Sequence, residues 1–299
     1  MLWRRLAIIG AALALLTGCS ALRMGYGQAP QLAWWWIDGY LDFDRAQQPR
    51  VRAALDQWFD WHRQTQLPDY AGVLARLRAE AAADVSPAQV CRWNERLRER
   101  IEPALERVLP AAAEIALTLT PAQLQHLEQR VAKANEQFRR EQLPPDPAER
   151  LATATERLLD RYESFYGRLD DAQRRLVVES AAASPYDPAA WAAEREDRQR
   201  ELLAALRRIV AERPDPARVQ ATLRTLARRF DGSAQGALQA QRLRLAQHHC
   251  ETIARLHNSA TAAQRQHLRR KLGGWEGDLR ALAAEAAPAL AQGEALPRR

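Results

Sequence analysis

The sequence predicts an all-α protein, a multi-helix and mostly antiparallel bundle of about eight to ten helices with no sheet. Three observations predict this fold class. Good helix formers dominate, chiefly alanine, leucine, arginine, glutamate and glutamine, while glycine supplies 13 of 299 residues. Apolar residues recur at helical spacing along almost the whole chain, without the alternation typical of strands. The apolar fraction of 47% is ample for a core, which excludes global disorder.

The predicted helices carry seams of apolar residues on one face, with arginine and glutamate on the other. In chain order, these seams run over residues 90–108, 124–138, 151–169, 202–209, 219–230 and 268–282. Clusters of turn residues separate the later helices, at 144–147, 184–188, 213–216 and 231–233.

A short pattern of a cap residue followed by Ala-Gln marks several of the predicted helix starts. Its Ser, Thr or Asp side chain accepts a bond from the first turn, and the glutamine returns to the amide of the cap. The starts are spaced irregularly, which argues against a solenoid of fixed period. They lie at Asp44–Gln47, Ser86–Gln89, Thr120–Gln123, Asp170–Gln173 and Thr261–Gln264.

The N-terminus reads as the signal peptide of a lipoprotein. Arg4 and Arg5 precede an apolar run that is shorter than the roughly 20 residues of a membrane span, and Leu16-Thr17-Gly18-Cys19 follows as a lipobox. We therefore expect a signal peptide over residues 1–18 and acylation of Cys19, with chains such as palmitate. An irregular lipidated tether over 19–33, a helical domain over 34–286 and a flexible tail over 287–299 complete the predicted organisation.

The predicted anchor also predicts a compartment. Ser20, rather than aspartate, follows the acylated cysteine, which favours the periplasmic face of the outer membrane. Attachment by more than one acyl chain is stable where a single chain is marginal. The predicted partners are thus the membrane, through the lipid, and an envelope protein of unknown identity.

The formal charge of +7 comes almost entirely from arginine, since Lys133 and Lys271 are the only lysines among 44 basic residues. Acidic residues are interleaved with the arginines, as in the segment 92–100. This mixing is typical of a solvated helix face with i,i+4 ion pairs. Together with the predicted compartment, it argues against a nucleic-acid partner.

Two cysteines remain once Cys19 is acylated. Cys91 and Cys250 either form a disulfide, as an oxidising compartment permits, or remain unpaired as small buried side chains. The sequence leaves both alternatives open, because it does not give the distance between their Cα atoms.

An aromatic segment close to the predicted anchor is a candidate contact surface. Trp34, Trp35 and Trp36 lie 15 to 17 residues after Cys19. Indole side chains favour the headgroup zone of a membrane, so these residues either contact the membrane or a partner, or pack onto the bundle.

Two clusters contain side chains that could take part in catalysis or metal binding, but neither cluster matches a recognised motif. Asp38, Asp42 and Asp44 suggest acid–base work or a hard cation, yet acidic residues also stabilise helix starts. His248, His249, Cys250 and His257 lack the spacing of known zinc sites. We assign no catalytic residue, no metal and no cofactor.

The segment Leu119-Thr120-Pro121-Ala122-Gln123 resembles the Leu-Thr-x-x-Gln motif of the Spy and CpxP type of periplasmic stress chaperones. That resemblance implies an all-helical protein that holds envelope clients.

A second resemblance covers most of the mature chain. It rests on the lipobox, the aromatic segment 34–42, Gln47, Trp61-His62-Arg63, the segment 67–71, the capped helix at Ser86 and the Leu119–Gln123 segment. In this order they resemble a family of uncharacterised proteobacterial helical lipoproteins, which implies lipidation and supplies no activity.

The function predicted from the sequence is therefore interaction rather than catalysis. We expect a lipid-anchored periplasmic protein that holds or senses other envelope proteins in a groove between amphipathic helices. A Spy-like chaperone is the first alternative. A peptidoglycan-acting enzyme that depends on Asp38 or Asp42 is the second.

Overall fold

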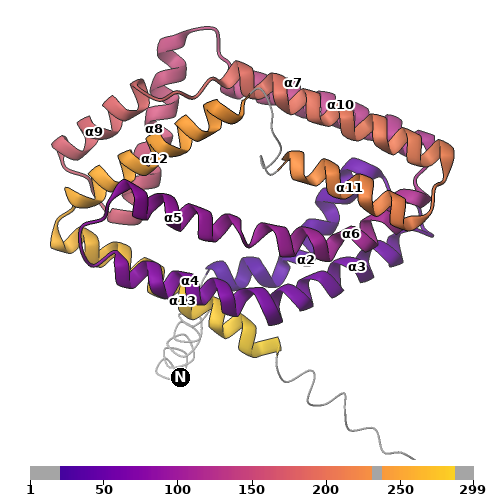
Figure 1. Ribbon diagram of the computed structural model, residues 1–299, viewed down its shortest axis with the longest axis horizontal. Helices are drawn as coiled ribbons and strands as arrows, with labels where there is room; N and C mark the ends of the chain where they lie inside the picture. The colour runs from indigo at the N-terminus through magenta and orange to yellow at the C-terminus, as the bar shows by residue number, and fades with distance from the viewer. Residues whose placement is uncertain (1–20, 231–237, 287–299) are drawn as a thin grey trace, which may run out of the picture.

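A computed structural model of the chain describes residues 21–230 and 238–286. These residues are helical almost throughout and contain no strand, so the all-α prediction is confirmed (Figure 1). The first half of the chain forms α2 (Ala21–Leu41), α3 (Gln48–Trp61), the π-helix η1 (His62–Gln66), α4 (Leu67–Glu80), α5 (Pro87–Arg98), α6 (Ile101–Thr118) and α7 (Pro121–Gln142). The second half forms α8 (Pro147–Tyr166), α9 (Asp171–Ala182), α10 (Pro188–Glu212), α11 (Pro216–Phe230), α12 (Gln239–Asn258) and α13 (Ala262–Ala286).

Several of these helices join into longer rods. The rod α3-η1-α4 is continuous, and a two-residue turn joins α5 to α6 into a second rod. The π turn lies directly before Leu67-Pro68. Pro68 has no N–H to donate, and the wider turn carries the rod past the missing bond.

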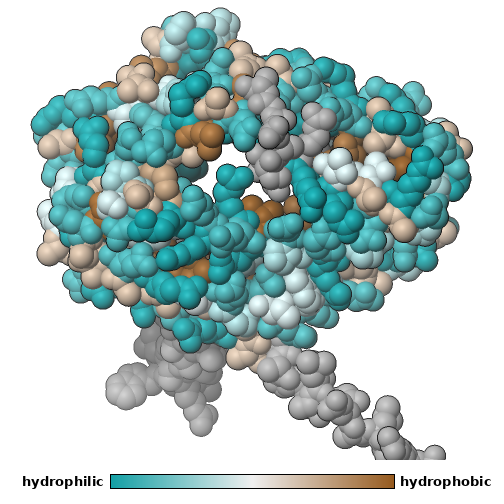
Figure 2. Space-filling model, viewed as in Figure 1, coloured by the Kyte–Doolittle hydropathy of each residue, from teal (hydrophilic) through white to brown (hydrophobic). Residues whose placement is uncertain are grey.

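The helices surround a central opening, and their buried side chains gather at two ends of the molecule. Figure 1 shows the helices around this opening, and Figure 2 shows the surface hollowed at the same place. We call α2, α3, α6, α7, α10 and α11 the first lobe, because their buried residues form one hydrophobic cluster. We call α4, α5, α8, α9, α12 and α13 the second lobe, which holds two further clusters. The two rods cross between the lobes in opposite directions.

All five predicted Ala-Gln helix starts form in the structure. In each, the glutamine side chain accepts a bond from the backbone N–H of the cap residue, and the cap side chain accepts one from the backbone N–H of the glutamine. At Asp44 the bonds form within a turn, and the α-helix begins at Gln48.

Four of these glutamines are also bonded to one another in pairs. In the first lobe, Gln47 and Gln123 exchange Nε2–H···Oε1 bonds of 3.2 and 2.7 Å. Each then donates to a carbonyl two residues before the cap of the other: Gln47 to Thr118 O at 2.8 Å and Gln123 to Asp42 O at 3.0 Å. We call this arrangement an amide clasp, because it ties two helix starts together.

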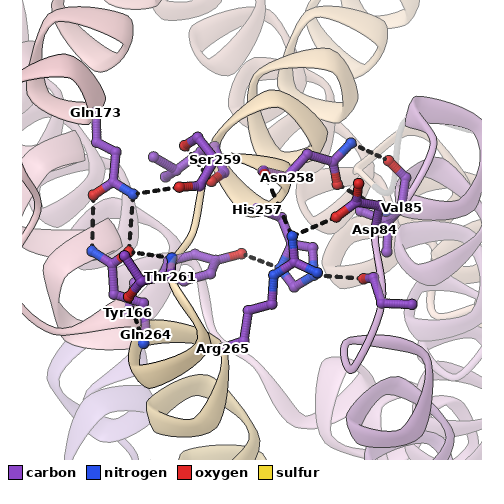
Figure 3. Close-up of polar contacts among 12 residues, drawn as sticks. Asp84, Val85, Tyr166, Gln173, His257, Asn258, Ser259, Thr261, Gln264 and Arg265 are labelled. Atoms are coloured by element: carbon purple, nitrogen blue, oxygen red, sulfur yellow. Dashed lines mark hydrogen bonds and ion pairs between the residues drawn. The ribbon is translucent and has the colours of Figure 1, made fainter.

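The second lobe repeats the amide clasp with different residues. Gln173 and Gln264 exchange bonds of 2.9 and 2.8 Å, and donate to Ser259 O and Arg168 O at 3.1 and 2.9 Å (Figure 3). Gln173 is 2% exposed. Buried amides need partners, and here each glutamine is satisfied by the other's helix start.

A second set of polar bonds holds the corner between α12 and α13. The side chain of His257 lies between the Tyr166 hydroxyl, 3.0 Å from Nδ1, and the Ala83 carbonyl, 3.0 Å from Nε2 (Figure 3). Asn258 pairs with both backbone groups of Val85, at 2.8 and 3.0 Å. This corner is thereby fixed to the loop between α4 and α5 and to α8.

A disulfide also joins two helices of the second lobe. Cys91 of α5 and Cys250 of α12 are bonded, with their Cα atoms 5.5 Å apart and 159 residues between them in sequence. Of the two alternatives left open by the sequence, the structure has the bonded one.

The segment 21–33 differs from the irregular tether that we predicted. It is helical and forms the first part of α2. Pro30, Gly25 and Gly27 weaken the helical signal, but tertiary contact outweighs propensity. The Tyr26 hydroxyl, for example, lies 2.8 Å from Nδ1 of His62 in the long rod. The predicted signal peptide, Cys19 and the tail 287–299 lie outside the described residues.

Candidate functional site: an apolar cavity in the first lobe

The first lobe encloses a cavity of about 590 Å³ between α2, α3, α6, α7 and α10, with one residue from α11. Most of its lining is apolar and comes from helix faces that turn toward the cluster of the first lobe. Ile37 and Tyr40 come from α2, Leu55 and Trp58 from α3, and Leu202 from α10. Ligand cavities in proteins span about 300–1,000 Å³, so this cavity is of ligand-binding size.

Small side chains on α6 leave the space open. Ala111, Ala112 and Ala116 line the cavity where neighbouring helices present large residues. The ring of Trp58 is held at the wall, because its Nε1–H donates to the Ala104 carbonyl at 3.0 Å.

One wall of the cavity carries polar groups from α10. Arg195, Arg198 and Gln199 reach the lining. Asn135 of α7 fixes two of them, since it accepts from Arg195 Nε at 3.0 Å and donates to Gln199 Oε1 at 2.6 Å. Burial lowers the pKa of the Arg198 guanidinium, while Glu194 acts in the opposite direction. An arginine stays charged under such a shift, so this wall is cationic.

The cavity reaches the surface beside α2. Trp36 lines it and is still 67% exposed. The rings of Trp36 and Tyr40, both in the lining, are 5.0 Å apart. Val108 of α6 also lines the cavity and is 37% exposed, so the lining reaches the surface at both helices.

The structure divides the three consecutive tryptophans. Trp34 is 4% exposed and packs in the core, stacked 5.9 Å from Phe43 and covered by the guanidinium of Arg52 at 4.0 Å. Trp35 is 62% exposed and Trp36 is 67% exposed. Of the two alternatives for this segment, packing thus holds for Trp34, while Trp35 and Trp36 remain available for contact.

The three clustered aspartates have structural bonds. Asp38 accepts from the backbone N–H of Phe43 at 3.1 Å, and Asp44 caps its turn with bonds of 2.8 and 2.9 Å. Asp42 follows α2 in a left-handed conformation with φ of 46°. Its carbonyl accepts from Gln123 in the amide clasp. These residues shape the loop between α2 and α3.

The histidines and the cysteine near residue 250 each bond to a different partner. Cys250 is in the disulfide, His248 Nε2 is 2.9 Å from the Ser180 carbonyl, and His257 bonds to Tyr166. In the parts of the chain that the structure describes, no group of three or more His, Cys, Asp or Glu side chains is placed to hold a metal ion.

Sequence reasoning missed the cavity. Its lining comes from six helices spread over residues 36–223 and contains no motif. The alanine run 111–113 on a helix between large neighbours was the available signal. The same reasoning predicted the helix starts one by one but not their pairing into clasps.

The chain belongs to a family of unknown function, DUF6279, whose model matches residues 39–232. The match begins near the end of α2 and extends just past α11, so it includes almost all of the cavity lining. No curated protein and no solved structure matches the chain. The described helices contain no stretch with the length and hydropathy needed to cross a membrane.

Proposed function

We propose that the protein is a lipid-anchored binding protein of the cell envelope that holds an apolar segment of a partner protein in the cavity of the first lobe. The cavity itself carries the proposal. It is of ligand-binding size and mostly apolar, and its lining reaches the surface at Trp36 and at Val108. An amphipathic helix or an extended segment with large apolar side chains is the kind of partner that such a groove accepts.

The N-terminal sequence supports this place in the envelope. The lipobox ending at Cys19 and the serine after it favour a lipid anchor on the periplasmic face of the outer membrane. The bond between Cys91 and Cys250 supports an oxidising compartment of this kind. The anchor would hold the cavity within reach of other envelope proteins.

A binding role accounts for the aspartates better than an enzymatic one. Asp38 and Asp44 accept bonds from backbone amides, which leaves their carboxylates engaged in the loop before α3. The Leu-Thr-x-x-Gln motif likewise has a structural use, because Gln123 is part of the amide clasp. The motif and the carboxylates thus have structural roles, and neither supports a second candidate function.

The test is in-cell crosslinking of the full-length protein, followed by mass spectrometry of the captured proteins. Ala112→Phe fills the cavity from the α6 wall. Ala75→Phe is the matched control, because Ala75 lines a surface hollow on the second lobe. We expect one or two discrete envelope proteins, lost in A112F and kept in A75F.

Two results would overturn the proposal. Capture that is equal in both variants would place the binding surface outside the cavity. A broad spread of clients that grows under envelope stress would replace a dedicated partner with a chaperone role.

A further inference from the structure

The exposed face of α2 carries large apolar side chains, with the uncharged polar residues Gln28 and Gln31 among them. Its large side chains are Met24, Leu32, Trp35 and Trp36, with exposed fractions of 63, 52, 62 and 67%. At 100° per residue, Met24, Gln28, Leu32 and Trp35 follow one another up the same side of the helix, and Trp36 borders that side. Contiguous exposed apolar surface of this kind marks a contact site.

No charged residue belongs to this face. The two charged residues of α2 have partners away from this face. Arg23 forms an ion pair with Glu285 of α13, and Asp38 accepts a hydrogen bond from the backbone N–H of Phe43. The exposed leucine of α12 has a different setting. Leu243 is 65% exposed but stands alone between Arg242 and Arg244.

We infer that this face of α2 lies on the surface of a lipid bilayer. The predicted acylated cysteine, Cys19, is two residues before Ala21, the first residue of α2. An anchor at that position holds α2 against the membrane. Tryptophan prefers the headgroup zone, and aliphatic side chains such as Met24 and Leu32 enter the acyl boundary of an interfacial helix.

A cation borders the same face. The Arg52 guanidinium donates to Oε1 of Gln31 at 3.3 Å, and Gln31 is on the same side of α2 as Met24 and Trp35. Basic groups beside an apolar face attract anionic headgroups. A second copy of the chain fits less well, because four side chains of one helix are small against the roughly 800 Å² per partner of a stable interface.

This orientation also bears on the cavity. Trp36 belongs both to the exposed face of α2 and to the lining of the cavity. With α2 on the bilayer, the cavity lining at Trp36 would lie close to the membrane surface. Partners with an apolar segment there would be within its reach.

The experiment measures tryptophan quenching in the full-length protein on vesicles of phosphatidylethanolamine and phosphatidylglycerol with brominated acyl chains. The test variant is Met24→Glu with Leu32→Glu, which puts two charges on the face. Leu243→Glu is the control, since its exposure of 65% matches the 63% of Met24. The double variant Trp35→Phe with Trp36→Phe identifies the quenched residues. Circular dichroism checks that each variant is folded.

We expect at least a twofold loss of quenching in M24E/L32E and in W35F/W36F, with none in L243E. Unchanged quenching in M24E/L32E would overturn the inference. A wild-type dimer in sedimentation that M24E/L32E dissociates, without any change in quenching, would assign the face to a second copy. Neither result depends on the partner in the cavity, so this test and the crosslinking test fail separately.

Discussion

The two lobes use the same amide clasp around different interiors. In the first lobe, Gln47 and Gln123 tie two helix starts beside a cavity of about 590 Å³. In the second, Gln173 and Gln264 tie two helix starts beside a filled core that contains Tyr162 and Leu256. A clasp of two amides therefore fixes the helix geometry without deciding whether the space between the helices is filled.

The second lobe also holds the disulfide, which joins α5 to α12. The bonds of His257 and Asn258 fix its corner between α12 and α13. We interpret the second lobe as a rigid frame and the first as the binding part. The predictions below test this division, from the largest expected effect to the smallest.

Removing the disulfide should destabilise the frame most. For Cys91→Ser with Cys250→Ser, we expect a loss of about 3–5 kcal/mol in the free energy of unfolding, because the bond closes a long loop. Denaturant unfolding of the oxidised and serine forms measures the loss. Equal stability of the two forms would show that the second lobe does not depend on this tie.

Breaking either amide clasp should lower the free energy of unfolding by nearly as much as removing the disulfide. Gln123→Ala and Gln173→Ala each remove the bonds between the paired amides and leave a backbone carbonyl and the N–H of a cap residue without this partner. We expect each variant to lose about 2–4 kcal/mol in the free energy of unfolding. Gln89→Ala is the control, because Gln89 completes a helix start at Ser86 without pairing to another glutamine in the described residues. That variant should lose only about 1 kcal/mol. An equally large loss of stability in Gln89→Ala would mean that the clasps stabilise the fold no more than ordinary helix caps do.

The same substitution should have different effects in the two lobes. Ala81→Leu overfills the second lobe, where Ala81 is 1% exposed, and should cost about 1–3 kcal/mol. Ala112→Leu extends into the open cavity, and we expect its stability to stay within about 1 kcal/mol of the wild type. Thermal unfolding compares them. An equal penalty at both positions would mean that the first lobe is as closely packed as the second.

The smallest expected effect is a loss of stability in mild acid. Burial lowers the pKa of His257 from its ordinary value of 6.5, so the unfolded chain takes up this proton first as the pH falls. The stabilisation is complete above pH 7 and declines as the pH falls through 6.5 toward the lower folded pKa. Unfolding midpoints between pH 8 and pH 5 measure it. His257→Gln should flatten this decline, and an identical slope in the variant would assign the decline to other groups.

The sequence predicted local features well and long-range ones poorly. Capping chemistry depends on four consecutive residues, so all five Ala-Gln starts were predictable. The pairing of Gln47 with Gln123, 76 residues apart, depends on how whole helices pack. The helical start of α2 was missed for the same reason, since contacts such as Tyr26 with His62 override its glycines and proline.

The candidate site was less predictable than the fold. Trp34, Trp35 and Trp36 were identified as a group, but helix geometry puts Trp34 in the core and the other two outside. The cavity depends on which helices face Ala111 and Ala112, and a single sequence does not contain that information.

The most direct test of the division between the lobes is photo-crosslinking from matched aromatic positions in living cells. Benzoylphenylalanine replaces Tyr40, which is partly buried at the cavity, or Phe165, which is partly buried against Trp275 in the second lobe. We predict adducts to a discrete envelope protein from position 40 and none from position 165. Adducts from position 165 alone, or equal adducts from both, would contradict the assignment of binding to the first lobe.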